Sequence, residues 1–358
     1  MSLIFCRRCV MDGTAKEIVL DKDGVCNFCH QAQKSLKEVE AEKVNLAKWV
    51  YQIKKDGQGK KYDVLLGLSG GVDSSTVLHH AVRLGLRPLC YSIDNGWQSD
   101  LAQENIMKLV EGLKVPFFRQ TINLNRFRDL QSAFIKAGLK NIEIPSDHII
   151  TASALDIADK YGIKWILSGG NVATESIMPE SWGYQPRDLV HVKAVYKWAT
   201  GKRLVGLPVC GLLKWNIYKW VKGIKTFYLL DYLDYNLEES KKMLLEKYKW
   251  VNYGGKHEES VFTKWFQSYY LFEKFGIDKR KAHYSSLINS GQLTRKVAME
   301  SLATRPEYPL LGLEKKVMSY PKHDYKDFKN DEKLWNLLAA SIRQLKRLYR
   351  RLTLTGKS

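Results

Sequence analysis

The sequence predicts a doubly wound α/β fold, in which an open parallel β-sheet carries helices on both faces. An apolar run at 62–68, in which Asp63 is the one charged residue, is typical of a strand that is buried on both faces. Further apolar runs at 88–93, 116–122 and 163–167 alternate with helical stretches, which is the rhythm of βαβ units. In such a sheet, ligands bind in a crevice beyond the carboxyl ends of the strands.

A glycine-rich turn follows the first of these strands. It reads Leu68-Ser69-Gly70-Gly71-Val72-Asp73-Ser74-Ser75. Its two glycines permit a tight bend that points several backbone N–H groups into one concavity. From Ser74 to Gly85 the apolar residues recur at helical spacing, and a helix N-terminus behind such a turn binds anions such as a phosphate chain. A Walker-type loop is excluded because no Gly-Lys-Ser/Thr follows. The alternative is a simple strand-to-helix turn.

Polar residues also follow two other predicted strands. Asp94 and Asn95 come after the second strand, and Ser168-Gly169-Gly170-Asn171 comes after the last. Because the carboxyl ends of parallel strands share one edge of the sheet, we expect these residues to lie near the glycine-rich turn. For Asp94 and Asn95, the alternative is ordinary turn chemistry.

Two Cys-x-x-Cys pairs open the chain. Their members are Cys6, Cys9, Cys26 and Cys29. The spacing is typical of a closed tetrahedral thiolate site, so we predict a structural zinc ion in a small knuckle. An iron–sulfur cluster and free thiols are the alternatives.

We expect three regions along the chain. Residues 1–58 form the zinc knuckle and a linker helix at 33–53, and residues 59–205 form the α/β domain with the glycine-rich turn. Residues 206–358 form a mainly helical substrate or partner region packed on the core, ending in a basic amphipathic helix at 331–354. The many aromatic residues after position 171 fit helical packing, with a stacking platform for nucleic acid bases as the alternative.

The composition bounds the partners and the compartment. The formal net charge is +19, from 57 Lys and Arg against 38 Asp and Glu, which favours anionic partners without choosing among them. No apolar run reaches the length of about 18 residues that a membrane span needs, and the start lacks a signal-peptide pattern. We therefore expect a cytoplasmic protein with reduced thiols and no membrane span.

Two stretches late in the chain gather polar residues with no evident structural need. One is Tyr253-Gly254-Gly255-Lys256-His257-Glu258-Glu259-Ser260. The other is Phe275-Gly276-Ile277-Asp278-Lys279-Arg280-Lys281-Ala282-His283. The cationic trio Lys279, Arg280 and Lys281 could clamp a phosphate chain, with a solvated charge run as the alternative. Thr294 is placed to cap the following helix.

With these motifs, the chain resembles the N-acetyl sugar amidotransferases of bacterial surface-polysaccharide biosynthesis, which make O-antigen and flagellin sugars. The two late stretches and the cysteine pairs carry the resemblance to this family. The run from Ser69 to Ser75 resembles the pyrophosphate loop of the wider PP-loop ATP pyrophosphatase superfamily, whose fold is of the adenine-nucleotide α-hydrolase-like type. The resemblance covers about residues 5–305.

The resemblance implies an ATP-dependent conversion of an acetamido group on a nucleotide-linked sugar into an acetamidino group. The amide oxygen would attack the α-phosphate of ATP, and ammonia would then displace AMP from the O-adenylyl imidate. The implied ATP-binding residues are Leu68, Ser69, Gly70, Gly71, Asp73, Ser74, Ser75, Asp94, Asn95, Gly169 and Gly170. Asp73 would contact Mg²⁺, and Lys256, Lys279 and Arg280 would contact phosphates.

Further implied roles concern the substrate and the ammonia. Asn171, Glu258 and Glu259 would bind the substrate, and His257, Glu258 or Glu259 would orient the acetamido group or take a proton from ammonium. No glutaminase signature surrounds Cys90 or Cys210, so a separate glutaminase partner is expected.

Two rival functions use the same residues differently. The first is a tRNA-modifying PP-loop enzyme, a thiolase or a lysidine-type ligase, which would exploit the positive charge. Thiolation usually needs a persulfide-carrying cysteine near the loop, and neither Cys90 nor Cys210 has a partner cysteine, so nucleic acid is not the expected partner. The second is a non-catalytic zinc-knuckle protein that binds nucleotide.

Overall fold

Five parallel strands form a single sheet in the computed structural model, which describes residues 4–183, 185–338 and 340–341. The strands are β1 (Val64–Gly67), β2 (Pro88–Asp94), β3 (Phe117–Thr121), β4 (Trp165–Leu167) and β5 (Lys225–Phe227). Their order is β3-β2-β1-β4-β5, so strands are added on one side of β1 up to β3 and on its other side from β4 onward, and the strand order reverses between β1 and β4. This is the predicted doubly wound arrangement, and such a reversal point is where ligands bind in open α/β sheets.

The four predicted strands are confirmed, but β5 was missed. It has only three residues, Lys-Thr-Phe, so it carries no apolar run that sequence periodicity could detect. It pairs with β4 in parallel, joining Trp165 to Lys225 and Leu167 to Phe227. The sheet therefore continues past residue 205, where we expected the α/β domain to end.

Successive side chains of β1 pack into two different hydrophobic clusters, one on each face of the sheet. Val64 and Leu66 pack in a cluster with residues of α3 (Val72–Arg83), α4 (Asp100–Leu113) and α10 (Leu237–Tyr248). Leu65 packs on the opposite face with residues of α6 (Ile144–Lys160). Because side chains alternate along a strand, a sheet covered on both faces needs a continuous apolar run, and the chain supplies one here.

Helix α3 begins at Val72, two residues before the predicted start at Ser74. Gly71 has extended backbone angles and occupies the N-cap position, so Val72 and Asp73 already belong to the first turn. A carboxylate in that turn is favoured by the positive end of the helix dipole. The predicted cap at Thr294 is confirmed, because its hydroxyl accepts a hydrogen bond from the Val297 backbone N–H.

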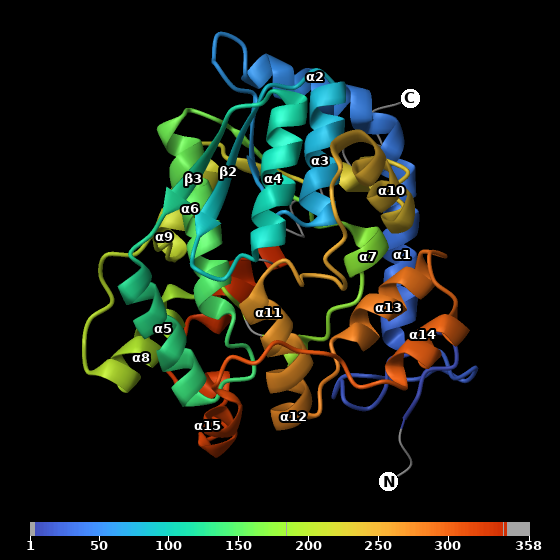
Figure 1. Cartoon of the computed structure of the whole chain (residues 1–358), viewed down its shortest axis with the longest axis vertical. Helices are drawn as coiled ribbons and strands as arrows, with labels where there is room; N and C mark the ends of the chain where they lie inside the picture. Colours follow the sequence, from blue (N-terminus) through green and yellow to red (C-terminus); the bar gives the residue numbers. More distant parts are fainter. Residues whose placement is uncertain (1–3, 184, 339, 342–358) are drawn as a thin grey trace.

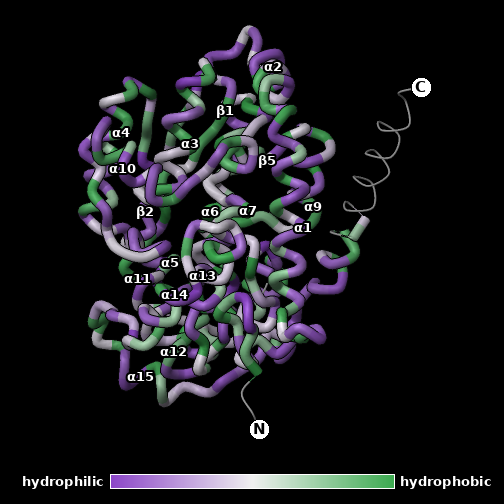
Figure 2. Tube along the Cα trace, turned by 90° about the vertical axis from the view of Figure 1, so that its right-hand side faces the viewer, coloured by the Kyte–Doolittle hydropathy of each residue, from purple (hydrophilic) through white to green (hydrophobic). Residues whose placement is uncertain are grey.

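A second cluster of helices lies beyond the carboxyl edge of the sheet, in the lower half of Figure 1 and Figure 2. Its core joins the cysteine knuckle to apolar residues of distant helices. The helices are α5 (Leu124–Ala137), α8 (Leu189–Thr200), α11 (Val261–Trp265), α12 (Leu271–Phe275), α13 (Arg280–Asn289), α14 (Arg295–Leu302) and α15 (Glu314–Ser319). The space between the two halves is where strand ends, loops and helices converge.

Shorter elements connect these parts. They are α7 (Val172–Glu175), η2 (Glu180–Trp182), α9 (Leu212–Asn216), the π-helix η3 (Ile217–Val221), η4 (Leu229–Tyr232), the π-helix η5 (Phe266–Tyr270) and η6 (Tyr325–Asp327). The helix predicted at 33–53 is two helices, α1 (Asn27–Glu42) and α2 (Leu46–Asp56), joined by the 3-10 turn η1 (Lys43–Asn45). Figure 1 shows α1 beside α13.

The predicted C-terminal helix is described only at its start. Residues 332–338 are helical, and Trp335 is buried against Trp215 with ring centroids 5.9 Å apart. Residues 342–354 of the predicted amphipathic helix lie outside the described residues. Within the described part of the chain, no helix combines the length and the apolar character that crossing a membrane requires.

Candidate active site

A cavity of about 1230 Å³ lies at the carboxyl edge of the sheet. Its wall includes the strand ends 67–69, 91–93, 166–169 and 226, which come from β1, β2, β4 and β5. Pockets for a single small ligand usually measure about 300–1,000 Å³, so this cavity has room for two ligands side by side.

The glycine-rich turn forms a tight bend at this cavity that only glycine fits. Gly70 has φ +85°, and a β-carbon there would lie 2.3 Å from the Ala102 carbonyl oxygen. The indole N–H of Trp250 donates to the Gly70 carbonyl at 3.0 Å, and the Gly71 N–H donates to Ser69 Oγ at 3.2 Å. Leu68 and Ser69 face the cavity. Ser74 and Ser75 are buried behind them.

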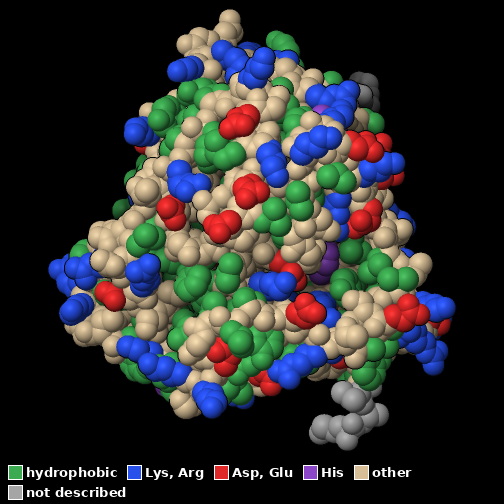
Figure 3. All heavy atoms as spheres, viewed as in Figure 1, with side chains coloured by type: hydrophobic (Ala, Val, Ile, Leu, Met, Phe, Trp, Pro, Cys, Tyr) green, Lys and Arg blue, Asp and Glu red, His purple; other side chains and the backbone are tan. Residues whose placement is uncertain are grey.

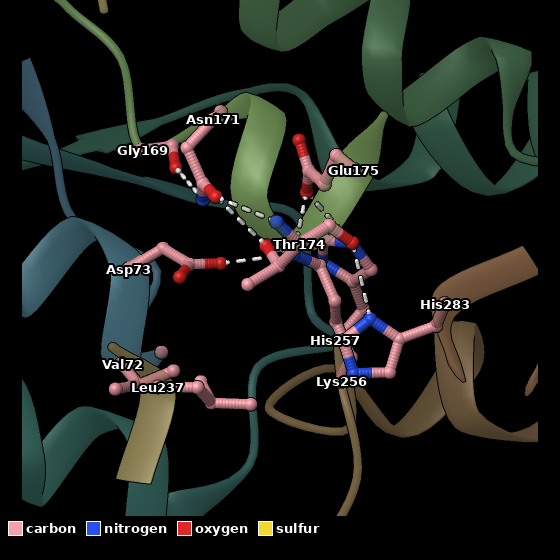
Figure 4. Close-up of polar contacts among 12 residues, drawn as sticks. Val72, Asp73, Gly169, Asn171, Thr174, Glu175, Leu237, Lys256, His257 and His283 are labelled. Carbon is pink, nitrogen blue, oxygen red and sulfur yellow. Dashed lines mark hydrogen bonds and ion pairs between the residues drawn. The ribbon is translucent and has the colours of Figure 1, made fainter. Parts of the chain in front are cut away.

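Lys256 joins the loop helix α3 to the short helix α7. Its ammonium lies 3.1 Å from Asp73 Oδ2 and 2.8 Å from Glu175 Oε1, and it donates to Thr174 Oγ1 at 2.8 Å. Figure 4 shows this side chain between residues from the two helices. Tyr235 donates a short hydrogen bond to the other oxygen of Asp73. Two carboxylates therefore share one cationic position beside the loop.

The charges of this network reinforce one another. Burial opposes the charge of Lys256, but Asp73 and Glu175 outweigh it and raise the pKa of the ammonium. Burial likewise opposes the charge of Glu175, yet His257 and Lys256 lower the pKa of its carboxyl. Although burial disfavours the imidazolium, Glu175 and Glu259 raise the pKa of His257, whose Nε2 lies 3.6 Å from Glu175 Oε1. The network thus holds charged partners in place.

The loop from Tyr253 to Glu259 contacts the glycine-rich turn directly. The Tyr253 hydroxyl accepts from the Val72 N–H at 3.3 Å, and a β-carbon on Gly71 would lie 3.1 Å from Glu259 Oε1. The other oxygen of Glu259, Oε2, is buried and has no hydrogen-bond partner among the described residues. Glu258 instead pairs with Lys264 at 2.7 Å and is not part of the described cavity wall.

The cationic trio is divided among three environments. Lys279 lines the cavity, where burial lowers its pKa. Arg280 turns away, forming an ion pair with Asp278 at 2.7 Å and donating to the carbonyls of Ser301 and Thr304. Lys281 pairs with Asp12 of the cysteine knuckle. The structure therefore brings one of the three, Lys279, to the cavity.

The other predicted strand-end residues have mixed placements. Asn95 and Gly169 line the cavity. Asp94 and Asn95 both accept hydrogen bonds from backbone N–H groups two residues on, which is turn chemistry. Gly170 lies against Tyr228, since a β-carbon there would be 3.3 Å from the ring. Asn171 is buried and caps α7 by accepting from the Thr174 N–H at 2.9 Å, so its side chain is already engaged.

Sequence reasoning missed several cavity residues, foremost a pair of acids on α6. Glu143, its N-cap, and Asp147 are one helical turn apart, and both face the cavity. Burial raises the pKa of both, and the charge of Glu143 adds to the effect on Asp147, whose pKa rises to about 7. The spacing of four within a helix was the only signal in the sequence.

The four knuckle cysteines converge as a single-ion site would require. All four Sγ atoms lie within 4.8 Å of one another, with Cys6–Cys29 at 3.9 Å and Cys9–Cys26 at 3.7 Å. Zn–S bonds of about 2.3 Å in a tetrahedron separate the sulfurs by about 3.8 Å. The cysteines therefore form a candidate metal site, and their arrangement suits a tetrahedral ion such as zinc.

The remaining cysteines and the surface charge bear on the rival functions. Cys90 and Cys210 are buried, and burial raises the pKa of each thiol, to about 12 and about 11. Neither belongs to the described cavity wall. Figure 3 shows Lys and Arg intermixed with Asp and Glu on the face that it draws, with no continuous basic patch there.

Comparison with known proteins gives one family match and several structural likenesses. Residues 259–311 match the model described as the C-terminal domain of WbpG-like LPS biosynthesis proteins. A comparison with curated proteins finds no match.

The structural likenesses are to three enzymes of low sequence identity. NMN synthetase from Francisella tularensis is 16% identical, with a TM-score of 0.29 over 55% of this chain and 74% of that one. The NH3-dependent NAD synthetase from Campylobacter jejuni is 15% identical, with a TM-score of 0.29 over 60% and 93%. The U34-tRNA thiolase NcsA from Methanococcus maripaludis is 15% identical, with a TM-score of 0.35 over 90% and 98%.

The matched segment forms part of the cavity wall. It supplies Glu259, Ser260, Thr263, Phe266, Gln267, Lys279, Ala282 and His283. Residues 259–311 of this chain are therefore similar to the C-terminal domain of WbpG-like LPS biosynthesis proteins.

Proposed function

We propose that the chain is an ATP-dependent amidotransferase of lipopolysaccharide O-antigen or flagellin-sugar biosynthesis. It would convert an acetamido group of a nucleotide-linked sugar into an acetamidino group, with ATP consumed to AMP and pyrophosphate. The observation that carries this proposal is that the glycine-rich loop and the WbpG-like segment wall the same cavity. The loop offers a phosphate site, and the matched segment ties that site to LPS biosynthesis.

The first step activates an inert amide. The acetamido oxygen attacks the α-phosphate of ATP, the bond between the α- and β-phosphates breaks, and pyrophosphate leaves, while the amide nitrogen releases its proton to water. The ammonium of Lys256 would stabilise the charge that develops on the leaving group, and the N–H groups of Gly71 and Val72 would do so on exchanging their present acceptors, Ser69 Oγ and the Tyr253 hydroxyl, for phosphate oxygens. Lys279 supplies a second cation in the same cavity. The product is an O-adenylyl imidate.

Asp73 and Glu175 are the residues that would hold Mg²⁺. They fit this ion because their carboxylates already share one cationic position, which Lys256 fills. Mg²⁺ usually takes one or two carboxylates plus phosphate oxygens, and it supplies neutralisation of the phosphate charge. With the carboxylates engaged in this way, Lys256 is free to turn toward the phosphates.

The second step replaces AMP by ammonia. A C–N bond forms at the imidate carbon while the C–O bond to AMP breaks, and the attacking nitrogen loses a proton. We assign that proton to Asp147, whose pKa near 7 suits a general base at neutral pH. His257 suits this role less well, because its pairing with Glu175 favours the protonated ring.

Ammonia would come from a separate glutaminase. Cys90 and Cys210 have raised thiol pKa values and do not belong to the described cavity wall, which is the opposite of an activated nucleophile. We expect the purified chain to work with ammonium salts and to use glutamine only when the partner is present. Glutamine-dependent activity of the chain alone would contradict this assignment.

The test is a reaction with ATP, Mg²⁺, ammonium and a panel of UDP- and CMP-linked acetamido sugars. Mass spectrometry should find AMP together with a sugar product that is lighter by the difference between O and NH. Reactions without ATP or without ammonium should give no such product. Modification of tRNA by the chain, with every sugar in the panel unchanged, would overturn the proposal in favour of the tRNA-modifying rival.

A further inference from the structure

The cavity extends past the glycine-rich loop to the β5 side of the sheet. There its wall includes Arg187, Trp215, Lys219, Thr226 and Tyr228. Lys219 Nζ lies 3.4 Å from the hydroxyl of Thr226 on β5, which fixes this group at the edge strand. We call these five residues the β5 shelf.

Two cations of the β5 shelf are arranged around one indole ring. The Arg187 guanidinium carbon lies 4.8 Å from the Trp215 ring centroid, and Lys219 Nζ lies 5.0 Å from it. Arg187 also lies 5.3 Å from the ring of Trp335, which is buried. Cation–π contacts of this kind fix the direction of a cation without neutralising it.

Arg187 is half-buried and lacks a carboxylate partner among the described residues. Its Nε donates to Gln185 Oε1 at 2.9 Å, but no acidic group of the described chain forms an ion pair with it. Burial accordingly lowers its pKa. Because an unpaired charge that is partly removed from water is costly, such a side chain in a ligand cavity indicates an anionic ligand. A guanidinium also matches phosphate oxygens with two parallel hydrogen bonds.

The position of the shelf separates it from the triphosphate of ATP. The glycine-rich loop follows β1 in the middle of the sheet, and the adenine is expected on the β2 side, near Asn95. The β5 shelf lies on the other side of β1 and β4, and Tyr228 connects it to Gly170. A second ligand bound at the shelf would therefore extend toward the loop from the opposite side.

We infer that the β5 shelf binds the diphosphate of a nucleoside-diphosphate-linked sugar. The inference rests on the proposed function and specifies its acceptor substrate: two adjacent phosphates match the two cations, Arg187 and Lys219. The Tyr228 ring is 47% exposed and offers an apolar face to the group beyond the phosphates. The sugar then points toward 168–170, where its acetamido oxygen approaches the α-phosphate of ATP.

Titration with UDP in the presence of a non-hydrolysable ATP analogue tests this assignment directly. We expect Arg187→Ala and Lys219→Ala each to weaken UDP binding at least tenfold, and Arg187→Lys to recover part of the loss. The matched controls are Arg203→Ala, which removes an exposed arginine, and Lys222→Ala, whose ammonium pairs with Asp159 at 3.1 Å. Neither control residue belongs to the described cavity wall, so neither should change UDP binding.

Steady-state kinetics separate the shelf from the ATP site and from the proposed function. The two shelf variants should raise KM for the nucleotide sugar at least tenfold and leave KM for ATP within about twofold of the parent value. A raised KM for ATP with unchanged UDP binding would assign the cations to the ATP phosphates and overturn the inference. Unchanged UDP binding with intact amidine formation would overturn the shelf alone. If no sugar is converted, UDP binding that is weakened by Arg187→Ala still supports the β5 shelf. If the two shelf variants instead lose binding to tRNA and keep their binding to UDP, the inference about the β5 shelf is refuted.

Discussion

Lys256 is the residue on which the arrangement of the site depends. It holds Asp73 of the glycine-rich loop helix and Glu175 of α7 in one ion-pair network, in which the side chains of Lys256 and Asp73 are 13% and 17% exposed and that of Glu175 is 30% exposed. Removing it would leave two neighbouring carboxylates without their cation, and loss of one partner from a buried network costs more than the loss of a surface ion pair.

Lys256→Ala should therefore lower kcat/KM for ATP by about 100-fold or more, because the leaving pyrophosphate loses a positioned cation. The measurement is the rate of pyrophosphate release at saturating sugar and ammonium. The matched control is Lys264→Ala, which removes a lysine that pairs with Glu258 away from the described cavity wall. Equal effects of the two substitutions would show that Lys256 acts only through general charge.

If Asp147 is the general base, the rate of the ammonia-dependent step should depend on pH. Burial and the charge of Glu143 raise the pKa of its carboxyl to about 7, so the ionised form that accepts a proton accumulates only as pH rises through 7. The rate of the ammonia-dependent step, corrected for the fraction of free ammonia, should rise across that range. Asp147→Asn should abolish this inflection and leave ATP binding unchanged. An unchanged pH profile in the variant would exclude Asp147 as the base.

The ionisation of Asp147 also affects the stability of the fold, which should fall as pH rises, whereas the rate of the ammonia-dependent step should increase. A carboxyl with a raised pKa in the folded state favours folding while it is protonated, and this contribution is lost as pH rises from about 4 toward 7. Asp147→Asn has no ionisable group at this position, so its stability does not fall in this way. Its melting temperature relative to the parent should therefore increase with pH over the same range.

At the scale of single residues, the sequence predicted what is local in the chain. The glycine-rich loop is one continuous motif, so its cavity-facing members Leu68 and Ser69 were expected. Arg280 was expected at a phosphate, but its neighbour Asp278 binds it, a contact that the sequence alone does not decide. Glu175, Asp147 and Arg187 reach the cavity from separate segments, and only folding brings them together.

At the scale of elements, the turn between β1 and α3 combines positive φ with a close backbone contact. Gly70→Ala should destabilise the protein by about 1–2 kcal/mol through its left-handed backbone alone. The new methyl group would also overlap the Ala102 carbonyl oxygen at 2.3 Å. Since that oxygen belongs to the backbone of α4, we expect the loop to shift and ATP binding to weaken at least tenfold.

Gly59→Ala is a matched control for this element. Gly59 has a similar φ of +76°, but a β-carbon there would meet no atom within 4 Å. Both variants should lose a comparable amount of stability to backbone strain, and only Gly70→Ala should lose ATP affinity. Isothermal titration with ATP and chemical unfolding of the two variants measure the two effects separately. Normal ATP affinity of Gly70→Ala would refute the phosphate role of the turn.

The predicted elements also show where periodicity fails. The four strands that carry apolar runs were predicted. The strand β5 has the sequence Lys-Thr-Phe, and it forms by pairing in parallel with β4. The helix predicted at 33–53 is divided by the turn η1. Nonlocal pairing and local breaks of this kind leave no period of two or 3.6 residues to detect.

At the scale of the whole molecule, the cysteine knuckle is hydrogen-bonded to α13, a helix far from it in the sequence. The Asn289 side chain donates to Cys29 Sγ at 3.3 Å, and the Val10 N–H donates to Ser285 Oγ at 3.2 Å. Both partners belong to α13, the helix that carries His283 to the cavity and follows Lys279. The candidate metal site and the cavity wall therefore share one element, α13.

Loss of the metal should consequently weaken both stability and activity. We expect about one zinc ion per chain by elemental analysis, and chelation or Cys9→Ser should lower the melting temperature and, below that temperature, reduce amidine formation, because α13 loses its support. Cys210→Ser is the control, since it removes a buried thiol remote from the knuckle and should retain the metal. A metal-free protein with unchanged melting temperature and activity would contradict this coupling, and iron with visible absorption in place of zinc would identify a cluster instead.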